Sequence, residues 1–173
     1  MGLNTGGMGT YSPVPQCTAE LEARVRSEVL DRFIAGLHAD GLAFKGMLFP
    51  GLILTAQGPK VLEFNCRFGD PETQVLLARL QTDLLDLIEA TIDGTLSSQH
   101  PQWMPGAAVC VILASGGYPE AYEQGKVITG LEEAGRHATV FHAGTRHQGD
   151  LVVTAGGRVL GVTATGENLI KAR

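Results

Sequence analysis

The sequence predicts an α+β fold in two successive parts, residues 1–103 and 104–173. In the first part, apolar residues recur at helical spacing, and two short apolar runs suit an antiparallel hairpin. In the second part, short apolar runs are separated by glycines, a pattern typical of small β-sheets. The polar, proline-flanked stretch 97–105 is interpreted as the linker between the two parts.

The composition excludes several classes of protein. The chain has 173 residues, 23 of them glycine, and a formal net charge of −5. An acidic chain of this kind does not favour binding to nucleic acid or to an anionic membrane. The sequence has no apolar run of membrane-spanning length. Its three cysteines are widely spaced, which predicts reduced thiols in a cytoplasmic protein and no zinc site.

The first fifteen residues contain four glycines and two prolines and have no helical or strand periodicity, so we expect a loop. Gly6, Gly7 and Gly9 would let backbone amides approach a ligand such as phosphate closely. The pattern matches neither the Rossmann nor the Walker fingerprint. A tight structural turn therefore remains the alternative interpretation of this loop.

Three helices are expected in the first part. Thr18 can cap a helix whose apolar stripe begins at Leu21 and ends at Leu37. Two further helical patterns cover residues 71–80 and 83–92, and Gly94 is a suitable end for the last of them.

The hairpin carries the most informative pattern in the sequence. A strand at 46–55, bent near Pro50, turns through 56–59 into a second strand at 60–68. In the second strand Glu63, Asn65 and Arg67 share one face, because side chains alternate between the faces of an extended chain.

A carboxylate and an amide two residues apart suit Mg²⁺, which binds few protein oxygens besides phosphates and water. The arginine Arg67 would add a planar charge for a phosphoryl group or a carboxylate. Asp70 and Glu72 follow at the entrance of the next helix, after Gly69 allows a sharp turn. The alternative is a half-exposed strand with an ordinary surface ion pair.

In the second part, a buried strand is expected at 107–114, followed by turn residues at 115–119. Short strands are predicted at the positions 127–128, 139–143, 151–154 and 158–163. Residues 155–157 are expected to close a hairpin between the last two strands, and a helix is expected to begin near Glu167.

Taken together, these motifs resemble the phosphoribosylamine–glycine ligase (glycinamide ribonucleotide synthetase) family of the ATP-grasp superfamily. The most distinctive run is Arg67-Phe68-Gly69-Asp70-Pro71-Glu72-Thr73-Gln74. Supporting runs, in the order expected for the family, are 4–9 with 11–13, 59–66, 114–119, 125–130, 140–145 and 153–164. Leu3, Thr10 and Pro50 depart from the residues usual in the family, beside these motifs.

The resemblance implies the ATP-driven ligation of glycine to 5-phosphoribosylamine in purine biosynthesis. It implies small-molecule substrates (glycine, 5-phosphoribosylamine and ATP), no nucleic-acid or membrane partner, and leaves the oligomeric state open. By resemblance, Glu63 and Asn65 would hold Mg²⁺ or Mn²⁺. Arg67, Asp70 and Glu72 would be the catalytic residues. The loop residues Asn4, Thr5, Gly6, Gly7 and Gly9 would contribute to cofactor binding.

The resemblance also predicts that residues 1–103 are the carboxy-terminal part of an ATP-grasp domain and that 104–173 form a small β-rich domain cut short at its end. The nucleotide-binding half of the family is not recognised here, so the isolated chain is expected to be inactive. Two alternatives stay open: a fragment that binds without turnover, and another ATP-grasp carboxylate–amine ligase.

Overall fold

The structure, a computed structural model, describes residues 2–173 and confirms the α+β fold. Its contacts divide the chain into two compact units, which are considered separately. The sheet unit comprises the chain up to Pro13 together with Asp70–Leu80 and Trp103–Arg173. The hairpin unit comprises Val14–Gly69 and Gln81–Gln102.

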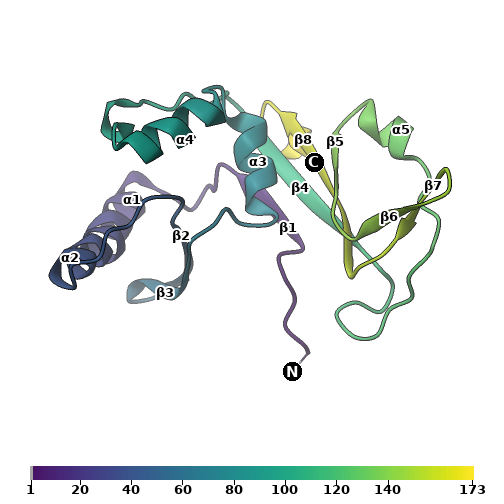
Figure 1. Cartoon of the computed structure of the whole chain (residues 1–173), viewed down its shortest axis with the longest axis horizontal. Coiled ribbons are helices and arrows are strands. Elements are labelled where there is room, and N and C mark those ends of the chain that lie inside the picture. Colours follow the sequence, from purple (N-terminus) through teal and green to yellow (C-terminus); the bar gives the residue numbers. More distant parts are fainter. Residues whose placement is uncertain (1) are drawn as a thin grey trace. The chain divides into compact units, whose positions relative to one another are not determined.

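A four-stranded antiparallel sheet forms the centre of the sheet unit (Figure 1). Its strands, in spatial order, are β1 (Gly9–Ser12), β4 (Ala107–Ala114), β8 (Arg158–Gly166) and β5 (Thr139–His142). Helix α3 (Glu72–Arg79) packs on β1, β4 and β8. A second, two-stranded sheet consists of β6 (Thr145–Gln148) and β7 (Leu151–Thr154), and the short helices are α5 (Leu131–Gly135) and α6 (Leu169–Ala172).

The core of the sheet unit lies between α3 and the central strand. Val75 of α3 is 2% exposed and packs with Ala108, Cys110 and Ile112 of β4. These three residues share one parity of the strand and therefore point to the same face of the sheet. Burying a valine side chain in this way contributes roughly 1.5–3 kcal/mol. The helix that follows Asp70 is thereby fixed to the sheet.

The hairpin unit contains the helical segment predicted from Thr18 onwards. It is formed by α1 (Ala19–Val25), a π-helical turn (Arg26–Leu30) and α2 (Asp31–Ala39). The Thr18 side chain accepts a hydrogen bond from the Leu21 amide, at 3.2 Å, which confirms the predicted cap. The other elements are β2 (Phe49–Thr55), β3 (Gly58–Asn65), α4 (Leu84–Asp93) and a 3-10 turn (Leu96–Ser98).

The predicted hairpin of the two apolar runs is confirmed. Strands β2 and β3 pair in antiparallel register from Phe49 opposite Asn65 to Thr55 opposite Gly58, with an irregularity at Gly51 and Leu52. The ring of Phe64 lies 4.7 Å from that of Phe33 in α2, measured between centroids. The apolar face of β3 thus contacts a helix through Phe64.

Several expectations were wrong. Residues Gly9–Ser12 form strand β1 instead of remaining in a loop, because they pair with Ala108–Val111 of β4. Strand β6 and helix α5 were not predicted. Strands β7 and β8 do not form a hairpin with each other, since they belong to different sheets. The turn between β7 and β8 is held by Gly144 instead. The Ala155 amide donates to the Gly144 carbonyl, and the Gly144 amide donates to the Arg158 carbonyl.

The compact units also differ from the predicted sequential division at residue 103. Strand β1 and helix α3 come from the first predicted part but pack with residues of the second, because β1 pairs with β4 and α3 covers β4. The strand expected at 127–128 is reduced to an isolated bridge between Val127 and Val153. The remaining predicted elements lie close to their expected positions. The division at 103/104 stays a prediction about domains rather than a description of packing.

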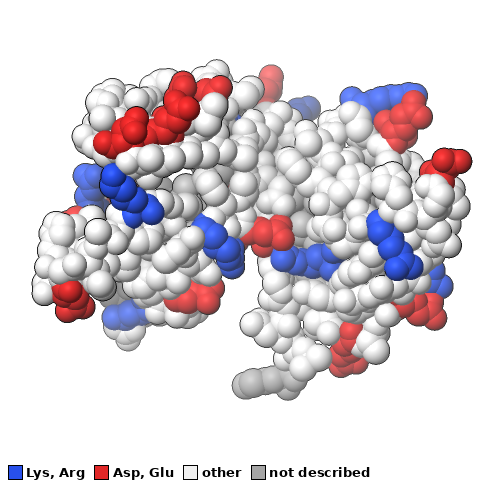
Figure 2. Space-filling view, in the orientation of Figure 1, with Lys and Arg blue, Asp and Glu red and all other residues white. Residues whose placement is uncertain are grey.

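On the face shown in Figure 2, acidic side chains gather over α4, and elsewhere acidic and basic side chains are interspersed. No helix within residues 2–173 combines the length and the apolar character needed to cross a bilayer. The three cysteines are unpaired; Cys17 and Cys66 are exposed, and Cys110 is buried in the core of the sheet unit.

Candidate functional site

Glu63, Asn65 and Arg67 form one connected row in the hairpin unit. The Asn65 side-chain amide Nδ2 donates to Glu63 Oε1 at 3.1 Å. The Arg67 guanidinium donates to Asn65 Oδ1 at 3.2 Å and to the backbone carbonyl of Phe68 at 2.9 Å. The three side chains therefore lie on the same side of the chain, as their spacing by two predicts.

Arg67 itself lies beyond the strand, which corrects the predicted extent of 60–68. Strand β3 ends at Asn65 because its partner β2 begins at Phe49, directly opposite. Residues after Asn65 consequently have no ladder partner, and the chain bends at Cys66 and Arg67. The guanidinium is held by hydrogen bonds to its own segment instead of by strand geometry.

The donor set of this row fits a hard divalent cation that keeps most of its ligands from water or phosphate. Glu63 is exposed, and its second carboxylate oxygen, Oε2, has no hydrogen-bond partner within residues 2–173. For Asn65 to offer an oxygen beside Glu63, its amide must rotate, since its nitrogen now faces that carboxylate. Across the described chain, no cluster of three or more His, Cys, Asp or Glu side chains could hold a metal alone. Two oxygens from this row are consistent with the few protein ligands that Mg²⁺ requires.

The glycine-rich loop lies in the sheet unit, and its backbone is held by side chains from distant segments. The Gly6 amide donates to the Tyr118 hydroxyl at 3.2 Å. The Gly7 carbonyl accepts from Arg158 at 3.1 Å. Asn4 and Thr5 are exposed, and Gly9 is the first residue of β1. The loop between Asn4 and Met8 is thus shorter than predicted and is anchored at its centre.

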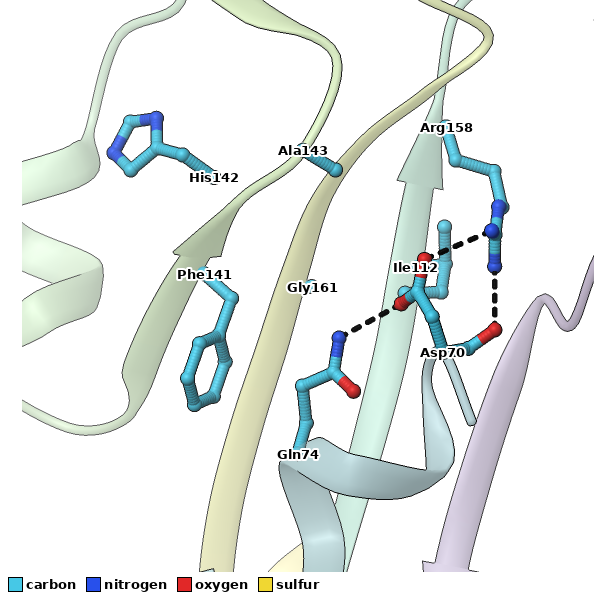
Figure 3. A pocket seen from close by; sticks show the side chains of 8 residues that line it. All are labelled: Asp70, Gln74, Ile112, Phe141, His142, Ala143, Arg158 and Gly161. Carbon is cyan, nitrogen blue, oxygen red and sulfur yellow. Dashed lines mark hydrogen bonds and ion pairs between the residues drawn. The ribbon is translucent and has the colours of Figure 1, made fainter. Parts of the chain in front are cut away.

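Asp70 lies beside a cavity of about 290 Å³ in the sheet unit (Figure 3). Its Oδ1 accepts from Gln74 Nε2 at 2.8 Å, and its Oδ2 accepts from Arg158 at 2.8 Å. The backbone carbonyl of Asp70 also accepts from Arg158, at 2.8 Å. Figure 3 shows Phe141 and His142 on the opposite side of the cavity from Asp70 and Arg158.

Glu72, the other predicted acid of this motif, is half-buried at the start of α3. Unlike Asp70, its carboxylate makes no hydrogen bond or ion pair within residues 2–173. The two acids therefore differ in their surroundings, although they are only two residues apart.

Sequence reasoning missed Arg158, Gln74 and Tyr118 as members of this site. Arg158 is 88 residues from Asp70, and Tyr118 is 112 residues from Gly6. No local pattern can join positions so far apart. Gln74 offered a signal, since it lies four residues after Asp70 and this spacing places two side chains on adjacent turns of a helix.

Comparisons with known proteins identify the family of the chain. Residues 1–73 match the family model described as phosphoribosylglycinamide synthetase, ATP-grasp (A) domain. Residues 108–173 match the model described as phosphoribosylglycinamide synthetase, C domain. The first of these matches places the chain in the ATP-grasp class of proteins.

Individual relatives show which family within the ATP-grasp class the chain resembles. The phosphoribosylamine–glycine ligase of Allochromatium vinosum is 52% identical over 174 residues, which cover 99% of this chain and 41% of that protein. The ligase of the same name from Vibrio cholerae is 51% identical over 176 residues, with the same coverage of each chain. The crystal structure of the Thermotoga maritima phosphoribosylamine–glycine ligase superposes with a TM-score of 0.82 at 36% identity and covers 99% of this chain.

The chain belongs to the phosphoribosylglycinamide synthetase family, also called phosphoribosylamine–glycine ligase. It spans about two fifths of the length of the curated relatives it matches: 41% of the A. vinosum protein and 42% of the T. maritima chain.

Proposed function

We propose that this chain forms part of an ATP-dependent ligase that joins glycine to 5-phosphoribosylamine, giving glycinamide ribonucleotide, ADP and phosphate. The names of the relatives and the two family models support the reaction. The single structural observation that carries the proposal is the exposed row of Glu63, Asn65 and Arg67. It offers a carboxylate, an amide and a guanidinium in sequence, which suits the charge of phosphoryl transfer.

The reaction has two steps, and both concentrate negative charge on phosphoryl oxygens. The glycine carboxylate attacks the γ-phosphorus of ATP, and ADP leaves. The amine of phosphoribosylamine then attacks the acyl carbon, loses a proton, and phosphate leaves. The protein must therefore hold the reactants in position and offset charge, rather than supply a covalent intermediate.

Glu63 and Asn65 would hold Mg²⁺ or Mn²⁺, each through one side-chain oxygen. The cation, when bound, offsets charge on the nucleotide phosphates. Arg67 lies next along the same row and would donate to the oxygens of the transferred phosphoryl group. Its guanidinium is already positioned by Phe68 and Asn65, so less of its side-chain freedom is lost on binding.

The residues that would contact the substrates are Asp70, Glu72 and the loop from Asn4 to Gly9. Within this set, Glu72 is the acid without a partner in the described chain, which favours it as the group that meets the substrate amine. The loop would contact the substrate through its exposed residues Asn4 and Thr5, while Gly6 and Gly7 are held by Tyr118 and Arg158. The unpaired cysteines are consistent with the predicted cytoplasmic location.

The proposal can be tested in a chimera in which residues 1–173 replace the matching 41% of the A. vinosum ligase. With ATP, Mg²⁺ and phosphoribosylamine, we expect phosphate release that depends on glycine. Alanine, serine and β-alanine serve as competitor acids. Equal turnover with another acid would contradict glycine as the substrate, and phosphate release without any acid would contradict ligation altogether.

A further inference from the structure

Arg158, the first residue of β8, joins two segments that the sequence assigns to the site. Its guanidinium donates to the Asp70 carboxylate, to the Asp70 carbonyl and to the Gly7 carbonyl, at 2.8, 2.8 and 3.1 Å. The Arg158 side chain is 24% exposed, whereas that of Asp70 is 50% exposed. An exposed ion pair of this kind adds little stability by itself. Its distinctive property is that one planar group meets three acceptors.

The backbone that carries Arg158 is firmly placed. Arg158 pairs with Ala114 of β4 on one side, and its carbonyl accepts from the Gly144 amide at 2.9 Å on the other. The preceding turn is fixed by Ser115, whose amide and hydroxyl donate to Gly157 and Gly156. The guanidinium therefore extends from a strand that is held on both sides toward the loop at Gly7 and the turn at Asp70.

Two glycines of the loop are explained by close contacts, Gly6 with Arg158 and Gly7 with Pro71. A Cβ atom on Gly6 would lie 2.9 Å from Arg158 Cζ, and one on Gly7 would lie 2.5 Å from Pro71 Cδ. Neither glycine has a positive φ, so close approach, rather than backbone conformation, is what requires them. The loop thus packs directly on the guanidinium and on the proline that follows Asp70.

Both carboxylate oxygens of Asp70 are occupied, one by Arg158 and the other by Gln74. An acid held in this way is poorly suited to bind a substrate amine. It is well suited to fix the turn that leads into α3. Glu72, on the first turn of that helix, has no such partner in the described chain.

We propose that Arg158 is a positioning residue, which locks Asp70 and the Gly6–Gly7 loop to the sheet so that Glu72 is the acid of this motif that meets the substrate. This inference rests on the proposed ligase function for its kinetic test and on the structure alone for its second test. Lysine cannot replace Arg158, because an ammonium group does not present a planar fork to three acceptors.

The kinetic test uses the chimera with A. vinosum described above. R158K and R158A should each lower kcat/KM for phosphoribosylamine by about 10–100-fold, the loss expected when a catalytic group is displaced by about 1 Å. KM for ATP should stay within about twofold of its original value, because Arg158 is proposed to position the residues that meet the amine and not those that bind ATP. The matched control is R146K, since Arg146 is an exposed arginine of the same sheet unit, in β6.

Two further readouts separate positioning from loss of fold. Guanidinium ions should partly restore the activity of R158A, whereas R146A should be as active as the original chimera with or without them. If Arg158 acts through Asp70, the D70N and R158A losses should not multiply, and the double variant should resemble the worse single variant. Multiplying losses, or an E72Q variant that keeps full activity while D70N is inactive, would overturn the assignment.

The second test needs no activity and uses the chain of 173 residues itself. In amide NMR spectra, R158K should shift the resonances of Gly6 and Gly7, and R146K should leave them in place. Unchanged glycine resonances in R158K would refute the contact directly. If the original chimera fails to ligate glycine, the proposed function is wrong, and the NMR result still decides whether Arg158 holds the loop.

Discussion

Replacing Gly7 by alanine should destabilise the sheet unit, and the size of the effect can be worked out from one contact. The new Cβ would lie 2.5 Å from Pro71 Cδ, whereas ordinary contacts begin near 3.4 Å. The two segments must therefore separate by about 1 Å, and overpacking of this kind costs roughly 1–3 kcal/mol. Alanine also lowers the conformational entropy of the unfolded chain, which stabilises the folded state by about 0.4–1 kcal/mol. The expected net loss is about 1 kcal/mol, within a range of about 0–2.6 kcal/mol.

Gly116→Ala is the matched control for this prediction. Gly116 belongs to the same unit, has no positive φ, and nothing lies within 4 Å of the Cβ it would gain. The free energy of unfolding of the Gly116→Ala variant should equal that of the original chain or exceed it by up to about 1 kcal/mol. Urea titrations followed by the fluorescence of Trp103, the single tryptophan, report on the sheet unit. Equal stability of the two alanine variants would refute the packing argument for the loop.

Two other predictions concern titratable groups. Burial raises the pKa of the Cys110 thiol. At pH 8 a thiol reagent should therefore label the exposed Cys17 and Cys66 quickly, and Cys110 only as fast as the protein unfolds. Rapid labelling of all three thiols would contradict the burial of Cys110 in the core. The hydrogen bond from Arg24, at 2.7 Å, lowers the pKa of Glu28 below its usual value of 4.5. Glu28→Gln should therefore be less stable than the original chain at pH 7. The difference in stability, measured by urea titrations followed by the circular dichroism of the helices, should close as the pH falls below the pKa of Glu28 in the folded state. A gap that persists in acid would exclude this ion pair as its cause.

The fold was predictable wherever a pattern is local. The stripe from Leu21 to Leu37 and the cap at Thr18 identified a long helical segment, and β4 was placed at its observed bounds. Strand β1 was missed because a short run of glycine, threonine, tyrosine and serine has no apolar alternation, and its pairing with β4 is a long-range contact. Strands β7 and β8 were predicted as a hairpin because adjacent strands usually pair, whereas Gly144 separates them here.

The candidate site was likewise predictable where its residues are close in sequence, and not where they meet through long-range contacts. Spacing by two brought Glu63, Asn65 and Arg67 to one side of the chain, and the structure joins them by hydrogen bonds. The roles of Asp70 and Glu72 could not be separated by spacing, because their difference depends on Arg158 in β8. A single arginine at the start of an apolar strand carries no signal of the partner it meets across the fold.

The metal dependence of ligation by Glu63→Gln in the A. vinosum chimera tests the central claim most directly. The substitution keeps the shape of an exposed side chain and removes the charge that would bind the cation. We expect kcat to fall by at least about 100-fold and the Mg²⁺ concentration needed for half-maximal rate to rise, with urea stability unchanged. Glu28→Gln, a substitution elsewhere in the same unit, should leave both kinetic quantities unchanged. Ligation by Glu63→Gln at the original rate and Mg²⁺ concentration would show that the row on β3 does not bind the metal.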